Sequence, residues 1–248
     1  MTGELYDRLG ERYSLARRAD PRIAASVWSL LGDAESVLNV GAGAGSYEPS
    51  DRTVVALEPS GVMRRQRPPE AAECVAGIAE ALPFADASFD SVMSVCSDWF
   101  WPRPQTAFTE MRRVARDRVV VLTVDRSAAE RFWLSREYLP NAHQLWRPFQ
   151  ETLAHIGPCE VHDVAIPGDC TDGFFHAYWR RPHAYLDPAV RESMAVFERL
   201  DSHEARVGLE RLAEDLDGGR WRERHGALLE TDALDLGYRV LVGSAHSP

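Results

Sequence analysis

The chain has 248 residues, of which 45% are hydrophobic and 27% are charged, close to the averages for a water-soluble globular protein. This composition excludes a collagen-like, disordered or membrane-embedded chain, and the length is sufficient for one large hydrophobic core. With 28 basic and 38 acidic residues the formal net charge is −10, which disfavours nucleic acid and anionic membrane surfaces as partners.

The first half of the chain alternates short apolar strands with helices. One helix is expected over 23–31, because Pro21 stands near its start and Gly32 at its end. A second helix is expected over 106–114. The expected strands are 36–40, 53–57, 73–76, 90–95 and 118–124. Continuous apolar strands separated by helices indicate a parallel sheet that is covered on both faces.

The second half of the chain has a different pattern, so residues 1–125 are taken as the core unit. Residues 126–167 hold an aromatic segment, a helix over 149–156 and a strand over 160–166. Residues 168–232 show no strand pattern, and we interpret them as a helical insertion that lies over the sheet, between its last two strands. Residues 233–248 return to the core with a strand over 236–242.

Two amphipathic helices are expected within the insertion, since apolar residues recur there at the spacing of one helix face. The apolar residues are Val190, Met194 and Phe197 in the first helix and Ala205, Leu209, Leu212 and Leu216 in the second.

The sequence predicts a cytoplasmic protein, either a monomer or a homodimer. Its N-terminal residues contain no apolar signal segment, and no run approaches the ~18 apolar residues of a membrane span. The four cysteines are Cys74, Cys96, Cys159 and Cys170. Two disulfides are conceivable, but widely spaced reduced thiols are the simpler interpretation. The eight histidines show no H-x-x-x-H spacing, so no metal site is expected.

A glycine-rich loop, Gly41-Ala42-Gly43-Ala44-Gly45, follows the first expected strand directly. Glycine lets the backbone turn sharply there and lets a ligand approach closely. Glu58 ends the next strand, 17 residues after Gly41, where a carboxylate of a doubly wound fold accepts both hydroxyls of a ribose. A ligand of the adenosine type explains the loop and the acid together. The alternative is a solvated acid before a turn.

The loop does not match the motifs of the commonest nucleotide cofactors. A dinucleotide fingerprint has a small residue five positions after its first glycine, where this chain has Ser46, and the third glycine comes one residue early. The chain contains no G-x-x-x-x-G-K-[ST] sequence, which excludes a phosphate-binding P-loop. The G-x-G-x-G spacing suits a cofactor without pyrophosphate, such as S-adenosylmethionine.

Several runs of residues resemble the class I S-adenosylmethionine-dependent methyltransferases, specifically their type 11 small-molecule group. The matching runs are SVLNVGAGAGSYEP, VVALEPSGVM, AEALPFADASFDSVMSV, EMRRVAR and RVVVLT. The resemblance covers about residues 1–125 and the final strand. It implies an α/β, Rossmann-like, doubly wound sheet of seven strands whose last strand is antiparallel, with a helical cap inserted near the C-terminus.

The resemblance also implies a set of cofactor-binding residues. They are Tyr13, Arg17, Arg18, Asn39, Gly41, Ala42, Gly43, Gly45, Glu58, Pro59, Met63, Ile78, Ala79, Glu80, Cys96 and Ser97. Three positions depart from the group. Asn39 stands where many members have an acid, and Ile78 stands where many have an aspartate that binds adenine. Trp99 and Phe100 stand where the group often has a histidine pair.

Two residues are candidates for acid or base catalysis. Asp98 follows the fourth strand and is expected near the methyl end of the pocket; its alternative role is a helix cap. His176 lies in a segment that concentrates titratable and aromatic groups, and its alternative role is a core residue.

The candidate substrate-binding residues are Trp99, Trp101, Phe132, Trp133, Tyr138, Tyr178 and Arg180. Aromatic rings suit an apolar substrate and can face a sulfonium cation. The alternative is that these residues attach the insertion to the sheet.

The sequence thus predicts a metal-independent methyltransferase that uses S-adenosylmethionine to methylate an oxygen, nitrogen or carbon atom of a small molecule. Two other functions stay open. The protein could cyclise or divert the aminocarboxypropyl arm of the cofactor, or it could bind the cofactor without catalysis.

Overall fold

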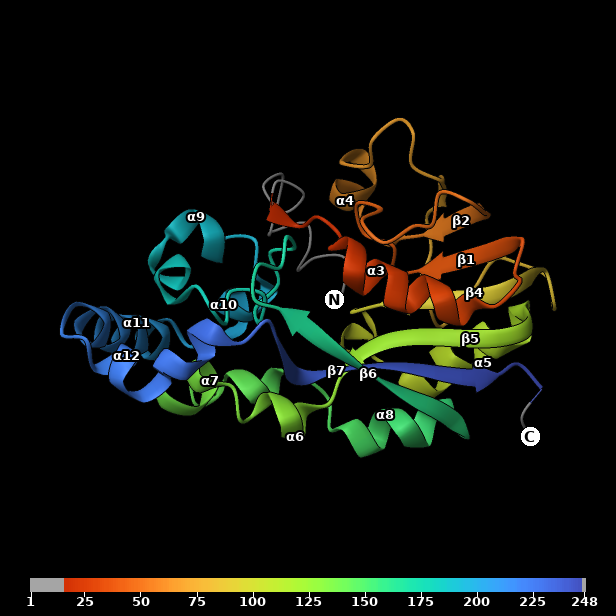
Figure 1. Cartoon of the computed structure of the whole chain (residues 1–248). Helices are drawn as coiled ribbons and strands as arrows, with labels where there is room; N and C mark the ends of the chain where they lie inside the picture. The colour runs from red at the N-terminus through yellow and green to blue at the C-terminus, as the bar shows by residue number, and fades with distance from the viewer. Residues whose placement is uncertain (1–15, 247–248) are drawn as a thin grey trace.

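The fold centres on a seven-stranded sheet in the strand order β3-β2-β1-β4-β5-β7-β6. This computed structural model describes residues 16–246 (Figure 1). The strands are β1 (Ser36–Val40), β2 (Thr53–Leu57), β3 (Glu73–Val75), β4 (Phe89–Val95), β5 (Ala115–Val124), β6 (Cys159–Pro167) and β7 (Ala233–Ser244). Strands β1 to β5 pair in parallel, whereas β7 runs antiparallel to both β5 and β6. The Rossmann-like sheet with an antiparallel last strand is therefore confirmed.

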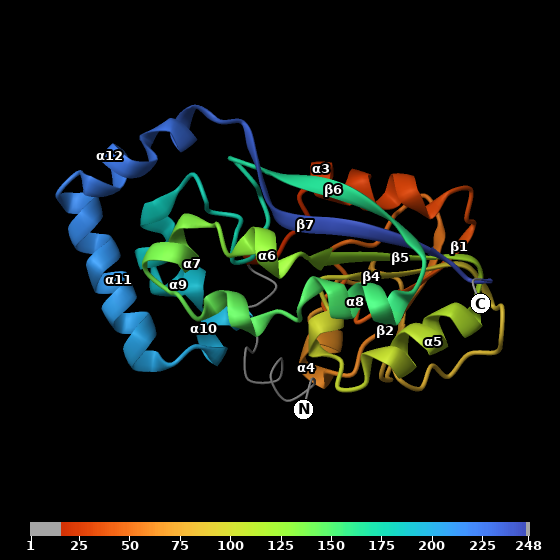
Figure 2. The ribbon, with the colours of Figure 1, turned by 90° about the horizontal axis from the view of Figure 1, so that it is seen from below.

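Helices cover both faces of the sheet, as Figure 2 shows. On one face lie α3 (Pro21–Trp28) and the short 3-10 helix η2 (Ser29–Leu31); on the other lie α5 (Pro104–Val114) and α8 (Phe149–Ile156). The side chains of β5 alternate between these layers, because Val120 is buried on the face of α3 and its neighbours Val119 and Val121 are buried on the face of α5.

Short helices lie at the edge of the sheet where the parallel strands end. Helix α4 (Gly61–Arg65) follows β2, and η3 (Asp98–Phe100) follows β4. The segment between β5 and α8 forms α6 (Arg126–Ala129), α7 (Trp133–Glu137) and η4 (Ala142–Leu145).

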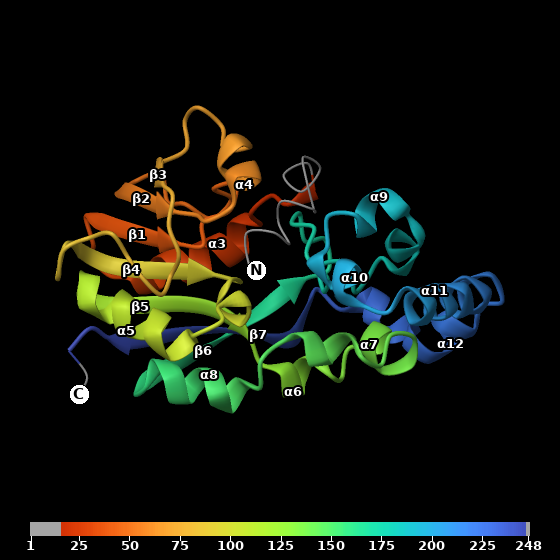
Figure 3. The same ribbon diagram turned by 180° about the vertical axis from the view of Figure 1, so that it is seen from behind.

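The insertion between β6 and β7 is helical throughout its regular part. Its elements are η5 (Pro182–Leu186), α9 (Pro188–Arg191), α10 (Ala195–Arg199), α11 (Ser202–Asp217), α12 (Arg220–His225) and η6 (Gly226–Glu230). Figures 1 and 3 show α9 to α12 beyond the end of the sheet toward which β1 and β4 point. The insertion therefore extends the carboxyl edge of the sheet and does not cover a face, contrary to the expectation from the sequence.

The first amphipathic helix expected in the insertion is two helices, α9 and α10. Met194 is the residue before α10 and has an extended backbone, and the Ser193 hydroxyl donates to the carbonyl of Val190. A side chain that bonds the backbone in this way competes with the helical hydrogen bonds. Met194 is nevertheless buried, so the apolar spacing indicated the buried face correctly but not the continuity of the helix.

The second expected helix is confirmed as α11. Asp201 caps its N-terminus by accepting a hydrogen bond from the backbone of Glu204. Ala205 and Leu212 are buried, and Leu209 and Leu216 pack against the same core.

Candidate functional site

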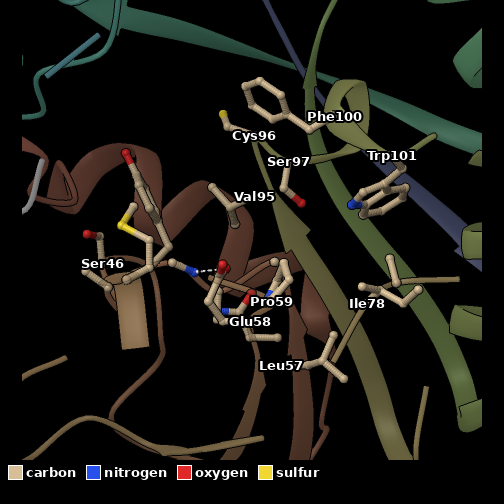
Figure 4. A pocket seen from close by; sticks show the side chains of 18 of the residues that line it. Ser46, Leu57, Glu58, Pro59, Ile78, Val95, Cys96, Ser97, Phe100 and Trp101 are labelled. Atoms are coloured by element: carbon tan, nitrogen blue, oxygen red, sulfur yellow. Dashed lines mark hydrogen bonds between the residues drawn. The ribbon is translucent and has the colours of Figure 1, made fainter. Parts of the chain in front are cut away.

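The candidate site is a pocket at the carboxyl edge of β1, β2 and β4, and Figure 4 shows it from close by. It holds about 920 Å³, including its opening to solvent. Its lining residues are Arg17, Asn39, Gly41, Ala42, Gly43, Ala44, Ser46, Tyr47, Leu57, Glu58, Pro59, Met63, Ile78, Ala79, Glu80, Val95, Cys96, Ser97, Phe100 and Trp101. In doubly wound sheets, ligands bind at this edge.

The glycine loop forms one wall of the pocket. The backbone N–H groups of Gly41 and Ala42 both donate to the carbonyl of Leu57, which ties the loop to β2. Gly41 has a φ of +71°, and a Cβ atom on it would lie 2.5 Å from Ser97 Oγ. Only glycine combines that backbone conformation with such a close approach.

Glu58 projects into the pocket from the end of β2 and is 5% exposed. Its Oε2 accepts a hydrogen bond from the N–H of Gly43 and its Oε1 accepts one from the N–H of Ser60, each at 2.8 Å (Figure 4). Burial raises the pKa of Glu58, and these two bonds oppose the rise. A carboxylate has about four acceptor positions, so each oxygen retains capacity for one hydroxyl of a ligand.

Asn39 lies at the floor of the pocket with its Oδ1 buried and without a hydrogen-bond partner among residues 16–246. Its Nδ2 donates to Glu48 Oε1 at 3.4 Å. Glu48 in turn pairs with the buried Arg67 at 2.7 Å. Because a buried acceptor without a donor is unfavourable, Oδ1 marks a place where a ligand donor fits.

Gly45 does not line the pocket, although the sequence placed it there. It has a φ of +91°, and a Cβ atom on it would meet Arg67 at 3.2 Å and Glu48 at 3.3 Å. This glycine therefore leaves space for the buried ion pair behind the loop. The ion pair in turn supports the loop that forms the pocket wall.

The far end of the pocket is apolar. Ile78 is 45% exposed, an unusual state for so large an apolar side chain, whereas Met63 is buried. Figure 4 shows Ile78, Pro59 and Trp101 at the same end as Glu58. Glu80 Oε1 accepts a hydrogen bond from the N–H of Arg103 at 3.2 Å. A flat ring that packs on Ile78 would remove its side chain from water.

A second pocket adjoins the first and shares Arg17, Cys96 and Phe100 with it. Its other lining residues are Trp99, Leu145, Trp146, Phe174, Phe175, Met194, Ala195, Val196, Arg199 and Tyr238. Most of these residues come from the insertion and from the segment before α8. The insertion therefore supplies the walls of the second pocket, and the core supplies its base.

Arg17 links the two pockets to the insertion. Its Nε donates to Asp172 Oδ1 at 2.7 Å, and the Tyr47 hydroxyl donates to Asp172 Oδ2 at 2.8 Å. Asp172 is 1% exposed. One buried carboxylate of the insertion thus holds a cation and a hydroxyl that both line the first pocket.

Cys96 occupies the left-handed region with a φ of +53°, uncommon for a residue with a side chain. It ends β4 where both pockets meet. Burial raises the pKa of its thiol above the usual value, so the thiol stays protonated and is no nucleophile at neutral pH.

Most of the expected cofactor-binding residues line the first pocket. The residues that do so are Arg17, Asn39, Gly41, Ala42, Gly43, Glu58, Pro59, Met63, Ile78, Ala79, Glu80, Cys96 and Ser97. Arg18 is exposed and lines neither pocket, like Gly45. Tyr13 lies outside the described residues.

Asp98 lines neither pocket, which contradicts its expected place at the methyl end. It is fully buried, and its Oδ2 accepts a hydrogen bond from Thr123 at 3.0 Å. Burial raises the pKa of its carboxyl to about 6. Ser97 occupies the capping position of η3, so Asp98 is not the helix cap either.

His176 also lines neither pocket, and its placement favours the alternative of a core residue. Its ring is fully buried among Phe132, Trp146 and Phe175. Burial lowers the pKa of His176 to about 3, so the ring is neutral at physiological pH. Its Nδ1 lies 3.1 Å from the hydroxyl of Tyr238.

Two of the seven expected substrate-binding residues reach a pocket. Trp101 lines the first and Trp99 lines the second. The residues that line neither are Phe132, Trp133, Tyr138, Tyr178 and Arg180. Several are tied into the interior: Trp133 donates to the carbonyl of Trp179, Tyr138 donates to Asp215, and Arg180 donates to the carbonyl of Thr231. Their positions fit the alternative role of attaching the insertion.

The sequence did not identify several residues that line the second pocket. They include Phe174, Phe175 and Met194 from the insertion and Tyr238 from β7. Phe174 and Phe175 could have been identified, because they lie directly before His176 in the segment that concentrates titratable and aromatic groups. Tyr238 gave no such signal, since a tyrosine within a strand is ordinary.

The described chain contains no helix that is long and apolar enough to cross a membrane. Within residues 16–246, no cluster of three or more histidine, cysteine or acidic residues could hold a metal ion. All four cysteines are free thiols.

Comparison with known proteins points to one enzyme class. A family model described as a methyltransferase domain matches residues 38–123. A crystal structure from Anabaena variabilis ATCC 29413, of a protein assigned provisionally as a methyltransferase from an antibiotic biosynthesis pathway, is similar with a TM-score of 0.85 and 31% identity. The match covers 92% of this chain and 98% of that chain. No curated protein matches the sequence.

Two more distant structures share the fold. A Thermotoga maritima protein described as a possible histamine N-methyltransferase has a TM-score of 0.53 and 22% identity, over 67% of this chain and 86% of that one. The geranyl diphosphate C-methyltransferase of Streptomyces coelicolor A3(2) has a TM-score of 0.51 and 12% identity, over 90% of this chain and 75% of that one.

Proposed function

Because the chain belongs to the class I S-adenosylmethionine-dependent methyltransferases, we propose that it methylates a small, largely apolar molecule bound in the second pocket. The observation that carries this proposal is that the two pockets adjoin each other and share the lining residues Arg17, Cys96 and Phe100. One pocket has the groups that a nucleoside with an amino-acid tail needs, and the other is walled by apolar side chains.

The first pocket fits the cofactor at both of its polar ends. Glu58 retains an acceptor position on each oxygen, which suits the two ribose hydroxyls. The buried Oδ1 of Asn39 lacks a donor, which suits the amino group of the methionine part. Asn39 stands where related enzymes have an acid, and its Nδ2 donates to the nearby Glu48, which holds the amide in place.

The remaining wall residues have positions that suit the other parts of the cofactor. Ile78, Pro59 and Met63 are apolar residues of the pocket wall, against which an adenine ring would pack. Arg17 lines the pocket next to Ser46, whose hydroxyl donates to the Arg17 carbonyl, and its side chain is held by Asp172, so its charge suits the carboxylate of the cofactor.

Methyl transfer from an activated cofactor requires little chemistry from the side chains of this protein. When bound, S-adenosylmethionine supplies an activated methyl group for an in-line displacement. The described residues align the acceptor and exclude water, which are the main protein contributions to such a reaction. Neither Asp98 nor His176 reaches a pocket, so the proposal includes no proton transfer to either. The protein is proposed to act in the cytoplasm as a monomer or a homodimer, without a metal ion.

Calorimetric titration tests cofactor binding. S-adenosylmethionine and S-adenosylhomocysteine are expected to bind, and Glu58→Gln is expected to weaken both by about 10- to 100-fold, because a hydrogen bond to a charged group contributes ~1.5–3 kcal/mol. Glu151→Ala, an exposed acid on α8, is the control and should bind normally. Micromolar binding of NAD with no response to S-adenosylmethionine would overturn the proposal.

Mass spectrometry of the cofactor product tests the reaction itself. Incubation with a panel of small aromatic acceptors is expected to yield S-adenosylhomocysteine. Formation of methylthioadenosine would instead support diversion of the aminocarboxypropyl arm. Tight cofactor binding with no product from any acceptor would support a binding module without catalysis.

A further inference from the structure

The second pocket contains one hydroxyl group among the described residues that line it, that of Tyr238. The rest of its wall consists mainly of aromatic and aliphatic side chains. Its other polar lining residues are Arg17, Arg199 and Cys96. A neutral hydroxyl among apolar side chains helps to fix the orientation of a ligand, since a ligand atom that can bond to it loses less on leaving water.

Tyr238 lines the second pocket together with Cys96 and Arg17, which also line the first. It is in β7, opposite Val124 at the carboxyl end of β5. The residue is 3% exposed, and burial raises the pKa of the hydroxyl well above its usual value. The hydroxyl therefore stays protonated and is available as a hydrogen-bond donor.

The only hydrogen bond that the described residues offer the Tyr238 hydroxyl is the one to His176 Nδ1, at 3.1 Å. The other ring nitrogen, Nε2, is buried and has no partner among residues 16–246. The proton of the neutral ring can be on either nitrogen. With the proton on Nε2, the Tyr238 hydroxyl donates to Nδ1, and the buried Nε2–H donor has no partner. With the proton on Nδ1, that nitrogen donates to Tyr238, and the hydroxyl proton needs another acceptor. A ligand oxygen that accepts this proton satisfies both donors and leaves only an acceptor, Nε2, unpaired, which is the less rare situation in proteins, so such a ligand favours the proton on Nδ1.

We infer that Tyr238 donates its hydroxyl proton to an oxygen atom of the acceptor substrate, and that His176 positions the hydroxyl for this bond by donating to it from Nδ1. The inference rests on the proposed function, whose second pocket it refines. It assigns the substrate class: an apolar, ring-bearing molecule with a carbonyl or oxyanion oxygen close to the atom that is methylated.

This assignment reverses the role that the sequence suggested for His176. As a base, the ring would become an imidazolium ion among Phe132, Trp146 and Phe175, and burial there lowers its pKa to about 3. As a neutral donor it needs no charge. His176 is accordingly a positioning residue, and Tyr238 is the group that contacts the substrate.

The position of the ring proton is directly measurable. The ¹⁵N chemical shifts of the full-length protein distinguish the two neutral tautomers of His176. With the protein saturated with S-adenosylhomocysteine and acetophenone, we expect the tautomer protonated on Nδ1. The tautomer protonated on Nε2 in that complex would overturn the inference, because Tyr238 would then donate to His176 and have no proton left for the ligand.

A pair of isosteric probes tests the donor. Acetophenone and α-methylstyrene differ by an oxygen in place of a CH₂ group, and ligand-observed NMR gives their dissociation constants with the protein saturated with S-adenosylhomocysteine. In Tyr238→Phe the preference for acetophenone over α-methylstyrene is expected to fall by about 3- to 10-fold, the equivalent of one neutral hydrogen bond. An unchanged preference, or no binding of either probe, would overturn the inference.

Two further comparisons separate positioning from structure. His176→Asn keeps an N–H near the place of Nδ1 and is expected to retain the preference, whereas His176→Phe keeps the ring and is expected to lose it. Tyr185→Phe is the matched control, since it removes a hydroxyl that donates to the carbonyl of Phe175 from the same aromatic cluster and lines neither pocket. Loss of the preference in Tyr185→Phe would show a general packing effect and contradict the assignment.

These outcomes are distinguishable from failure of the proposed function. A protein that binds S-adenosylhomocysteine but shows no dependence of the preference on Tyr238 overturns this inference alone. A protein that shows the preference without any response to S-adenosylmethionine overturns the methyltransferase proposal and leaves the hydroxyl as a ligand-binding group.

Discussion

Two glycines, Gly41 and Gly157, share a left-handed backbone but differ in what surrounds them. Gly41 has a φ of +71° and lies against Ser97 in the cofactor pocket. Gly157 has a φ of +77°, follows α8 and has open space where its Cβ would be. The pair therefore separates the backbone penalty of a side chain from the effect of a collision in the site.

Gly41→Ala is expected to weaken binding of S-adenosylhomocysteine by about 10-fold or more, ~1.4 kcal/mol, since the new Cβ would lie 2.5 Å from Ser97 Oγ and would displace the loop. Gly157→Ala should lose about 1–2 kcal/mol of folding stability through the backbone alone and bind normally. Calorimetric titration and urea denaturation measure the two quantities. Equal loss of affinity in both variants would contradict the role given to Gly41.

Asp98 is expected to make stability depend on pH. Burial raises the pKa of its carboxyl in the folded protein to about 6, from an ordinary value of 3.8. Below pH 3.8 both states are protonated, and no penalty arises. As pH rises from about 4 to 6, the unfolded state loses its proton first, so stability falls, and above pH 6 the full penalty of about 3 kcal/mol applies.

Asp98→Asn should abolish this dependence, because an amide does not ionise. Free energies of unfolding in urea from pH 4 to pH 8 are the measurement, and the difference between wild type and variant isolates Asp98 from other titrating groups. Asp51→Asn, at a side chain that is 73% exposed, should track the wild type. Parallel curves for wild type and Asp98→Asn would show that the buried carboxyl does not change its ionisation on unfolding.

At the scale of residues, the sequence predicted those parts of the site that depend on local spacing. Glu58 and Gly41 lie on two neighbouring strands, so their separation along the chain was enough to bring them together. Gly45 could not be placed correctly, because its role depends on the Glu48–Arg67 pair, which only the folded loop brings beneath it. Asp98 was misplaced because residue order does not tell toward which side of the loop a side chain points.

At the scale of elements, the start of α3 is also a junction with the insertion. Asp20 caps α3 by accepting a hydrogen bond from the N–H of Arg22 at 3.0 Å. The same carboxylate accepts the N–H of Thr171 at 3.0 Å. Asp20 is fully buried, and hydrogen bonds from the Arg22 side chain and from the backbone of Thr171 and Arg22 hold its pKa well below the usual range, so it is ionised at neutral pH.

Asp20→Ala is expected to destabilise the protein by about 2–3 kcal/mol, since it removes a cap, a partly buried hydrogen bond from the N–H of Thr171 and the ion pair with Arg22. Asp187→Ala is the matched control. It removes the cap of α9, which accepts the N–H of Ala189 at an exposed site, and should lose only ~1 kcal/mol. Urea denaturation gives both values. Similar losses would mean that Asp20 acts as a cap only, without joining the insertion.

The elements that the sequence predicted best are those with a strong local pattern. Strands β1 and β2 match their expected limits, and so does α8, because apolar runs bounded by turn residues fix them. The break between α9 and α10 was not predictable from apolar spacing, since one periodicity continues through both helices and the interruption is made by the backbone around Ser193.

At the scale of the molecule, the insertion and the sheet share one hydrophobic core. A single cluster of buried side chains includes Ile23 and Val120 next to the sheet and Trp179, Leu212 and Trp221 in the insertion. The sequence indicated that residues 168–232 form a helical unit but placed this unit over the sheet, because its true position depends on packing between distant segments. The shared cluster implies that the insertion is no separately folding lid.

We therefore expect sheet and insertion to unfold together. In pulse-labelling hydrogen exchange at increasing urea, peptides from β4 and α11 should lose protection at the same midpoint, since neither unit can keep its core without the other. Saturating S-adenosylhomocysteine should raise both midpoints equally, because a ligand that binds only the folded state stabilises every part that unfolds with the site. The expectation would be contradicted if α11 lost protection at lower urea than β4 and if the ligand raised the midpoint of β4 alone. The insertion would then unfold independently, and the second pocket would open without unfolding of the core.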